Sequence, residues 1–155
     1  MYVESIWQFP IKGVGGNSIN SARLFVDQTL PGDRRFAISV DSVKAAQAGD
    51  NVWLQKAHFL QLLKIDSLAQ LSCKFENSKI IIDQTGTQAF DGNLEHNDDR
   101  LRCQSFIANF LKCSDRELLR IHRIEKGSYT DQAEPLISIG GSASLTAFAR
   151  ETQTK

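Results

Sequence analysis

The first forty residues constrain the fold most, because short β-prone runs in this part of the chain are interrupted by two turns rich in glycine and proline. The first turn, at 10–16, carries a single lysine, Lys12, among three glycines. The second turn, at 31–33, leads through Arg34 and Arg35 into another apolar run. Glycine and proline interrupt helices, and alternating apolar and polar residues are typical of half-buried strands. We therefore expect a three-stranded antiparallel meander made of residues 3–11, 18–26 and 35–40.

The remainder of the chain predicts further strands and two helices. A polar turn at 76–78 between β-prone runs indicates a hairpin. An apolar stripe behind Asp98 and Asp99 indicates a helix, because acidic residues favour the first helical turn. The expected elements are hairpin strands at 68–75 and 79–82, a helix at 98–112, strands at 118–124 and 136–139, and a short C-terminal helix at 142–150. The predicted fold class is mainly β, with a β-barrel-like antiparallel sheet, and α+β overall.

Three connections between these elements are predicted in less detail. Residues 85–97 are polar and indicate a connection without a strand. Residues 41–50 are loop-like, with a short helical turn at 43–48 as the alternative. Residues 51–63 fit either a strand at 52–54 or a short helix that carries Leu60, Leu62 and Leu63. We expect the strand, followed by an irregular or helical segment.

Composition limits the class of protein. The chain has 155 residues, 41% of them apolar and 23% charged, which is typical of one globular domain. Eighteen basic residues balance eighteen acidic ones, so no overall field favours nucleic acid or anionic lipid. No apolar run reaches the roughly 18 residues of a membrane span, and no signal peptide is indicated. Three widely spaced cysteines fit reduced thiols. We expect a cytoplasmic protein without nucleic-acid or membrane partners.

The two N-terminal turns carry the residues best suited to bind an anion. Lys12 supplies an ammonium beside glycine N–H groups, and exposed backbone N–H groups attract anions. The planar guanidinium of Arg34 or Arg35 can fork onto a phosphate, and alternation sends these two side chains to opposite faces of a strand. Two plainer interpretations stay open: a hairpin turn with a solvated lysine, and an arginine paired at the surface with Asp33.

These residues resemble the N-terminal β-barrel domain that precedes the MOSC domain, in the family named after the C-terminal domain of molybdenum-cofactor sulfurase. The likeness lies in an aromatic-Pro-Ile-Lys segment with its glycine turn at 9–16 and a Gly-Asp-Arg-Arg-aromatic segment at 32–36. It continues weakly at 53–56 and returns at 131–147, which is similar to the start of the MOSC domain proper. The resemblance implies a MOSC N-terminal-like β-barrel domain at 1–130 and the start of a truncated MOSC-like segment at 131–155.

The resemblance implies a site for the molybdenum cofactor. The roles of the contacting residues in relatives would fall on Lys12, Gly13 and Arg34, with Arg35 and Lys56 as further cofactor-binding candidates. Gly13 stands where relatives commonly have serine, which leaves only a backbone N–H. Lys56 stands where arginine is usual, which keeps the charge but not the bidentate fork. At the level of the family, pyridoxal phosphate binding is implied as well.

The expected function is a molybdopterin-binding module that does not catalyse a reaction alone. Full-length relatives are molybdenum-dependent oxidoreductases or sulfur-transfer proteins, and their molybdenum ligand is a cysteine far downstream in the MOSC domain. Cys73, Cys103 and Cys113 do not match that cysteine. A protein partner that completes the MOSC domain is therefore implied, and no catalytic residue is predicted.

The alternative is a non-enzymatic β-barrel domain, with a binding or structural role, that recognises a protein partner or another anion. Such a domain would expose an apolar patch or an open sheet edge. A metal site is not predicted, because His58, His96 and His122 stand alone without ligand spacing. Residues beyond Gly140 are expected to be mobile, because a helix without a packing partner frays.

Overall fold

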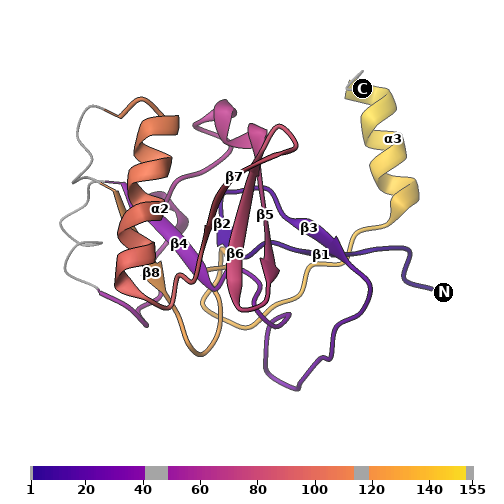
Figure 1. Ribbon diagram of the computed structural model, residues 1–155. Coiled ribbons are helices and arrows are strands. Elements are labelled where there is room, and N and C mark those ends of the chain that lie inside the picture. Colours follow the sequence, from indigo (N-terminus) through magenta and orange to yellow (C-terminus); the bar gives the residue numbers. More distant parts are fainter. Residues whose placement is uncertain (1, 41–48, 114–118, 153–155) are drawn as a thin grey trace.

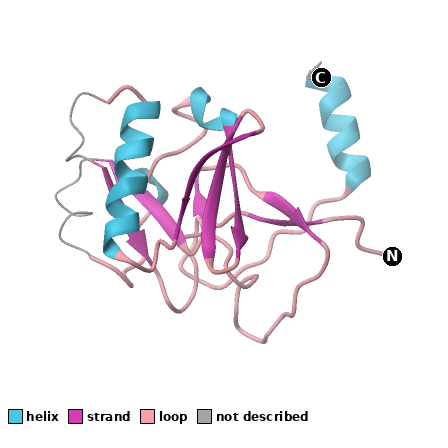
Figure 2. Ribbon diagram, in the orientation of Figure 1, coloured by secondary structure: helices cyan, strands magenta, loops and turns pink. Residues whose placement is uncertain are grey.

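The computed structural model describes residues 2–40, 49–113 and 119–152 and shows an α+β fold that is mainly β (Figure 1). This confirms the fold class predicted from the sequence. Eight strands in the described residues form three small sheets, which do not close into a barrel. The strands gather in the middle of the molecule, with one helix beside them and a second helix standing apart (Figure 2). The alternative of a helical turn at 43–48 lies outside the described residues.

The described elements run from short N-terminal strands to a C-terminal helix. The strands are β1 Ile6–Gln8, β2 Ile11–Lys12, β3 Asn17–Ile19, β4 Phe36–Val40, β5 Leu71–Glu76, β6 Lys79–Gln84, β7 Thr87–Gly92 and β8 Leu119–Arg123. The helices are the 3-10 turns η1 Lys56–His58 and η2 Asp66–Gln70 and the α-helices α2 Asn97–Phe110 and α3 Ser142–Thr152. The strand expected at 52–54 is wrong, because these residues form no strand. The segment after them is irregular or helical as expected, with η1 at Lys56–His58.

The predicted N-terminal meander is wrong, because Pro10 divides its first strand into β1 and β2. Pro10 has no N–H to donate, and the chain bends at this residue. β1 pairs antiparallel with β3 as a separate ribbon, whereas β2 pairs in parallel with β4. The Pro10 carbonyl accepts a 3.1 Å hydrogen bond from the Phe36 N–H, which extends the parallel pairing. The two N-terminal turns therefore lie next to each other.

β4 is the centre of the second sheet and lies between β2 and β8. Its residues Phe36, Ala37 and Ile38 are at most 1% exposed, as expected for a strand covered on both faces. β8 matches the strand predicted at 118–124 and pairs antiparallel with β4 along its whole length. A segment from late in the chain thus fixes the strand that leads out of the second turn.

β5, β6 and β7 form the third sheet, an antiparallel meander. The predicted hairpin is confirmed as β5 and β6, whose turn residues Asn77 and Ser78 have φ of 49° and 64°. Two consecutive positive φ angles match the tight turns that suit twisted hairpins. The expectation of a strandless connection at 85–97 is wrong, because β7 pairs with β6 there. Cross-strand pairing with an apolar strand outweighs the polar composition of β7.

α2 confirms the predicted helix near 98–112 and packs against β7 and β8 (Figure 1). Asp98 and Asp99 lie in its first turn, and His96 rather than Asn97 occupies the N-cap position. Cys103 and Ile107 are fully buried on its inner face. These side chains join residues of β4, β5, β6 and β8 in one apolar core. The core therefore holds β4, and with it the second turn, in a fixed position.

The last part of the chain, from residue 131 onward, forms an arm that leaves the body of the protein (Figure 1). The strand predicted at 136–139 is wrong: these residues are irregular and exposed. They find no neighbouring strand in the described residues to pair with. The predicted C-terminal helix is confirmed as α3, which contains no buried residue. No helix in the described residues has the length and apolar character needed to cross a membrane.

Candidate anion-binding site

One pocket of about 270 Å³ brings together four of the five cofactor-binding candidates, Lys12, Gly13, Arg34 and Lys56. They come from three separate segments of the chain, so only the tertiary fold makes them neighbours. Arg35, the fifth candidate, does not line the pocket. The remaining lining residues are Leu60, Gln61, Leu62, Leu63 and Asp131.

Lys12 is the most buried cation of the pocket. It ends β2, and its side chain is only 8% exposed. Its Nζ donates a 2.6 Å hydrogen bond to Asp131 Oδ1, and Lys56 Nζ lies 3.6 Å from Asp131 Oδ2. The hydrogen bond from Lys12 is the main reason that the pKa of Asp131 lies below its ordinary value, although burial acts in the opposite direction. The two ammonium groups therefore already hold one carboxylate between them.

Gly13 lets the backbone of the first turn approach the wall of the pocket. Its φ is +82°, and a Cβ atom at this position would lie 2.4 Å from the Leu60 carbonyl oxygen. A residue with a side chain, such as serine, would not fit this backbone without a shift. Two other N–H groups of the turn are already engaged, because Val14 donates to the Ile11 carbonyl and Gly15 to the Leu71 carbonyl. An anion in this pocket would therefore be attracted mainly by the side-chain cations rather than by backbone N–H groups.

Arg34 is held in place from both sides of the second turn. Its φ is +46°, which is uncommon for a residue with a side chain. Its N–H donates a 2.6 Å hydrogen bond to the Phe9 carbonyl, and its carbonyl accepts one of 2.8 Å from the Tyr129 N–H. The guanidinium pairs with the buried carboxylate of Asp33 and lies 5.1 Å from the Phe9 ring centroid. These contacts fix the guanidinium at the pocket that Lys12 and Gly13 also line.

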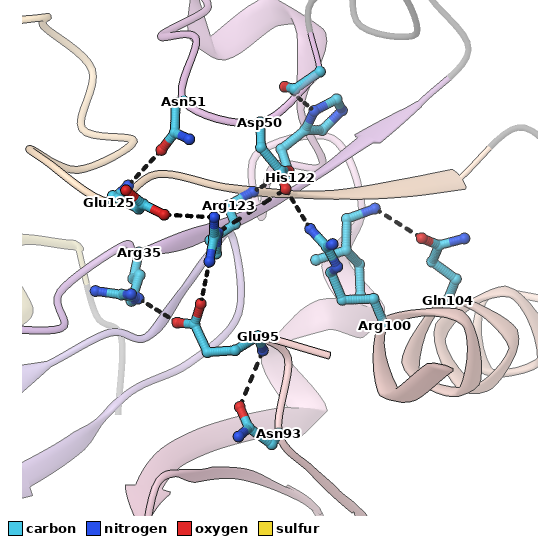
Figure 3. Close-up of polar contacts among 12 residues, drawn as sticks. Arg35, Asp50, Asn51, Asn93, Glu95, Arg100, Gln104, His122, Arg123 and Glu125 are labelled. Atoms are coloured by element: carbon cyan, nitrogen blue, oxygen red, sulfur yellow. Dashed lines mark hydrogen bonds and ion pairs between the residues drawn. The ribbon is translucent and has the colours of Figure 1, made fainter. Parts of the chain in front are cut away.

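Arg35 belongs to an ion-pair network with Glu95 and Arg123 and does not line the pocket (Figure 3). Its Nε donates a 2.7 Å hydrogen bond to Glu95, and Arg123 donates one of 2.6 Å to the second oxygen of the same carboxylate. Burial alone would raise the pKa of Glu95, but the hydrogen bonds from Arg123 and Arg35 outweigh it and lower the pKa. Arg34 lies in the turn with a φ of +46°, and Arg35 lies between the turn and β4, so the backbone turn rather than alternation along a strand separates Arg34, at the pocket, from Arg35, in a structural network.

The charges and the wall of the pocket define what it can bind. Lys12, Lys56 and Arg34 face the carboxylates of Asp33 and Asp131, so positive charge is in excess by one. Leucine side chains, among them Leu62 and Leu63, form an apolar wall beside the cations. Such a combination suits a ligand that has an anionic group and an apolar or aromatic body.

Two parts of the pocket escape reasoning from the sequence. Asp131 stands out there only as the first residue of the second stretch of resemblance, and nothing in its neighbourhood pairs it with Lys12, which is 119 positions away. The apolar run at 60–63 has the pattern of core residues. Leu60 is indeed buried, but Leu63 is 89% exposed at the pocket rim. The clue available in the sequence is this run of large apolar residues four positions after Lys56.

The cysteines are poor candidates for chemistry at this site. Cys73 and Cys103 are buried in the core, where they pack as apolar residues. Burial raises the pKa of Cys73 to about 12 and raises that of Cys103 as well, so both remain thiols at neutral pH. Within the described ranges, no three histidine, cysteine or acidic side chains come close enough together to hold a metal ion.

A second cavity, of about 350 Å³, lies between α2 and β8. It contains Arg100 and Arg120, but the carboxylate of Asp50 also lines it and pairs with Arg100 at 2.6 Å. Asp50 further accepts a hydrogen bond from the Arg123 N–H (Figure 3). This cavity therefore adjoins the structural ion-pair network and is a weaker candidate for an anion.

Three of the four converging residues, Lys12, Gly13 and Arg34, lie in the strongest part of the resemblance to the MOSC N-terminal domain, and Lys56 lies in a weaker part. Comparisons with protein-family models, with curated proteins and with solved structures found no match. The chemistry of the pocket is therefore the basis on which a function can be proposed.

Proposed function

We propose that the pocket binds an anionic, phosphate-bearing pterin of the molybdopterin type, and that the chain is a cofactor-binding module similar to a MOSC N-terminal domain. The observation that carries this proposal is the convergence of Lys12, Gly13, Arg34 and Lys56 on one pocket. The resemblance names these four residues together with Arg35, and four of the five line the same pocket although they come from three separate segments of the chain.

Each residue of the pocket would have a distinct role toward such a ligand. Lys12 and Lys56 would act as point charges toward a phosphate, and Arg34 would offer planar donors to a phosphate or a pterin oxygen. Gly13 would allow close approach of the ligand to the backbone. Molybdenum, when bound to the pterin, supplies redox chemistry. The described residues offer no exposed thiolate at the pocket to ligate a metal, so we infer binding rather than catalysis by this chain alone.

The proposal is tested by titrating the full chain with molybdopterin and following the pterin fluorescence. We expect saturable binding, and we expect Lys12→Met and Arg34→Met each to weaken it by roughly 10- to 100-fold, since hydrogen bonds to charged groups contribute about 1.5–3 kcal/mol. Lys79→Met is the matched control, because Lys79 is an exposed lysine, paired with Asp91, that does not line the pocket. Absence of binding by the unaltered chain would contradict the proposal.

A parallel titration with pyridoxal phosphate separates recognition of the phosphate from recognition of the pterin. If the pocket recognises only the phosphate, molybdopterin and pyridoxal phosphate bind with similar affinity, and Lys12→Met weakens the binding of both by the same factor. If the apolar wall contributes to pterin recognition, molybdopterin binds more tightly, and Leu62→Ser reduces this preference. Leu62 is 43% exposed, so the substitution does not disturb the core.

Recognition of a protein partner is the second candidate, and one observation favours it. The arm exposes large apolar side chains along its length, namely Leu136, Ile137, Ile139, Leu145 and Phe148. Exposed apolar patches mark interaction sites in soluble proteins. This candidate predicts that Leu145→Ser with Phe148→Ser abolishes binding to the partner and leaves molybdopterin binding unchanged. Loss of molybdopterin binding in that variant would contradict the separation of the two roles.

A further inference from the structure

The carboxylate of Asp131 occupies the position between the two lysines of the pocket. Its Oδ1 lies 2.6 Å from Lys12 Nζ, and its Oδ2 lies 3.6 Å from Lys56 Nζ. The side chain of Lys12 is 8% exposed, whereas that of Asp131 is 64% exposed. Lys12 is thus held within the protein, whereas Asp131 lies on the solvent-exposed side of the ion pair.

Asp131 lies where the chain passes from the body of the protein to the arm. Two residues earlier, Tyr129 is fully buried, and its hydroxyl donates a 3.1 Å hydrogen bond to the Arg123 carbonyl. The Thr130 carbonyl accepts a 3.2 Å hydrogen bond from Trp53 Nε1. From Asp131 through residue 148 every residue is exposed. Movement of Asp131 away from Lys12 therefore disrupts little packing.

An anion that enters the pocket must use the same ammonium groups that hold Asp131. A carboxylate left a few ångströms from a bound phosphate would repel it, because like charges at this separation interact unfavourably even near the surface. If another monoanion replaces the Asp131 carboxylate, the Coulomb attraction to Lys12 and Lys56 stays about the same. Exchange for a dianion strengthens the attraction to both lysines. The identity of the incoming charge thus decides whether displacement is favourable.

We propose that Asp131 is an internal competitor for the anion pocket, so that a dianionic group, such as a phosphate monoester, displaces it with a net gain in binding energy, whereas a monoanion displaces it with almost none. This inference rests on the proposed function, since it specifies the ligand class of the same pocket. Asp131 sets this threshold through its contacts with Lys12 and Lys56 and leaves the pocket when the ligand binds. A ligand with a terminal phosphate monoester fits this requirement, whereas a phosphodiester or a carboxylate does not.

The test compares methyl phosphate with dimethyl phosphate by amide NMR titration of the full chain at pH 8. Methyl phosphate is a dianion there, because its second pKa is about 6 as for other phosphomonoesters, and dimethyl phosphate is a monoanion of similar size. The unaltered chain is expected to bind methyl phosphate at least roughly 10-fold more tightly than dimethyl phosphate. In Asp131→Asn we expect both compounds to bind more tightly by a similar factor, because no carboxylate has to be displaced, so that weak binding of dimethyl phosphate becomes measurable. Unchanged affinities for both compounds in Asp131→Asn would overturn the competitor role.

A measurement on the unaltered chain covers the case in which Asp131→Asn, with its buried lysine unpaired, does not fold. The side-chain carboxyl ¹³C resonance of Asp131 is followed at pH 8, where methyl phosphate is a dianion, with and without saturating ligand. Displacement from Lys12 predicts that this resonance moves to the position of a solvated, unpaired aspartate when the ligand is bound. If methyl phosphate binds while this resonance does not move, the competitor role is wrong and the binding site stands. If methyl phosphate does not bind at all, the proposed function fails as well.

Discussion

At the scale of single residues, two backbone positions hold the pocket in shape. Gly13 and Arg34 both have positive φ angles, and each stands within two positions of a buried core residue, Val14 and Phe36 respectively. Positive φ costs a residue with a side chain roughly 1–2 kcal/mol, so Arg34 keeps this conformation only because its neighbours enforce it. The hydrogen bonds of Arg34 to Phe9 and Tyr129 provide that enforcement. The position of the guanidinium is thereby fixed before any ligand arrives.

Replacement of Gly13 by alanine is expected to destabilise the protein by about 2–4 kcal/mol, because backbone strain and a clash act together. The added Cβ would lie 2.4 Å from the Leu60 carbonyl oxygen. Gly86→Ala is the matched control, since Gly86 has φ of +85° but an added Cβ there would meet no atom within 4 Å. Urea denaturation measures both variants, and the control should lose only about 1 kcal/mol. Equal losses would show that the contact with Leu60 is unimportant.

At the scale of elements, a buried histidine links the paired strands β4 and β8. His122 on β8 is 1% exposed, and its Nε2 lies 2.8 Å from the hydroxyl of Ser39 on β4. Its Nδ1 lies 3.0 Å from the Gly49 carbonyl, which can only accept, so Nδ1 carries the proton and Nε2 accepts from Ser39. The ring also meets that of Phe59 edge to face at 6.1 Å. A neutral imidazole therefore contacts the Ser39 hydroxyl, the Gly49 carbonyl and the Phe59 ring at the same time.

This arrangement predicts a loss of stability in mildly acidic solution. Burial is the main cause that lowers the pKa of His122 below its ordinary value of 6.5. The unfolded chain then takes up a proton at a higher pH than the folded one. Stability is complete above about pH 6.5 and falls as the pH decreases below it, by up to about 1.4 kcal/mol per pH unit until the folded pKa is reached. Urea denaturation at pH 7, 6 and 5 measures this slope.

The variant His122→Gln is expected to be less stable at pH 7 but to show a smaller slope between pH 7 and pH 5. Glutamine keeps a polar side chain near Ser39 without an imidazole to protonate. His96→Gln is the control, because it removes an exposed imidazole. If His122→Gln keeps the slope of the unaltered chain, the pH dependence comes from other groups.

At the scale of the whole molecule, the body and the arm differ in how they are stabilised. The body has a continuous apolar core to which two of the three sheets and α2 contribute. α3 contributes no buried residue and stands away from the sheets (Figure 1). An isolated helix of 11 residues is marginal in water, because nucleation is costly and no tertiary packing supports it. The stability of the body should therefore not depend on the arm.

Removal of residues 141–155 is expected to change the free energy of unfolding by less than about 0.5 kcal/mol, as for surface changes without buried contacts. In the full chain, amide exchange in α3 should be close to that of an unprotected peptide. The amides of α2, which packs on the core, serve as the internal reference and should exchange far more slowly. Strong protection of α3 in the monomeric chain would contradict this expectation.

The sequence by itself determined those features that depend on neighbours along the chain. The hairpin of β5 and β6, the helix α2 and the strand β8 follow from local periodicity and turn residues, and they are present as predicted. The choice of Lys12, Gly13 and Arg34 came from two turns and a resemblance. These signals are local, because hydrogen bonds within a turn or a helix join residues a few positions apart.

Only the tertiary structure decided how these parts meet. The parallel pairing of β2 with β4, the strand β7 and the absence of a closed barrel among the described strands depend on contacts between distant segments. The ion pair between Lys12 and Asp131 spans 119 positions, and Arg35 pairs instead with Glu95, which is 60 positions away. No local pattern encodes such a contact. Its partners are selected by burial of the core, which brings β2, β4 and the start of the arm together.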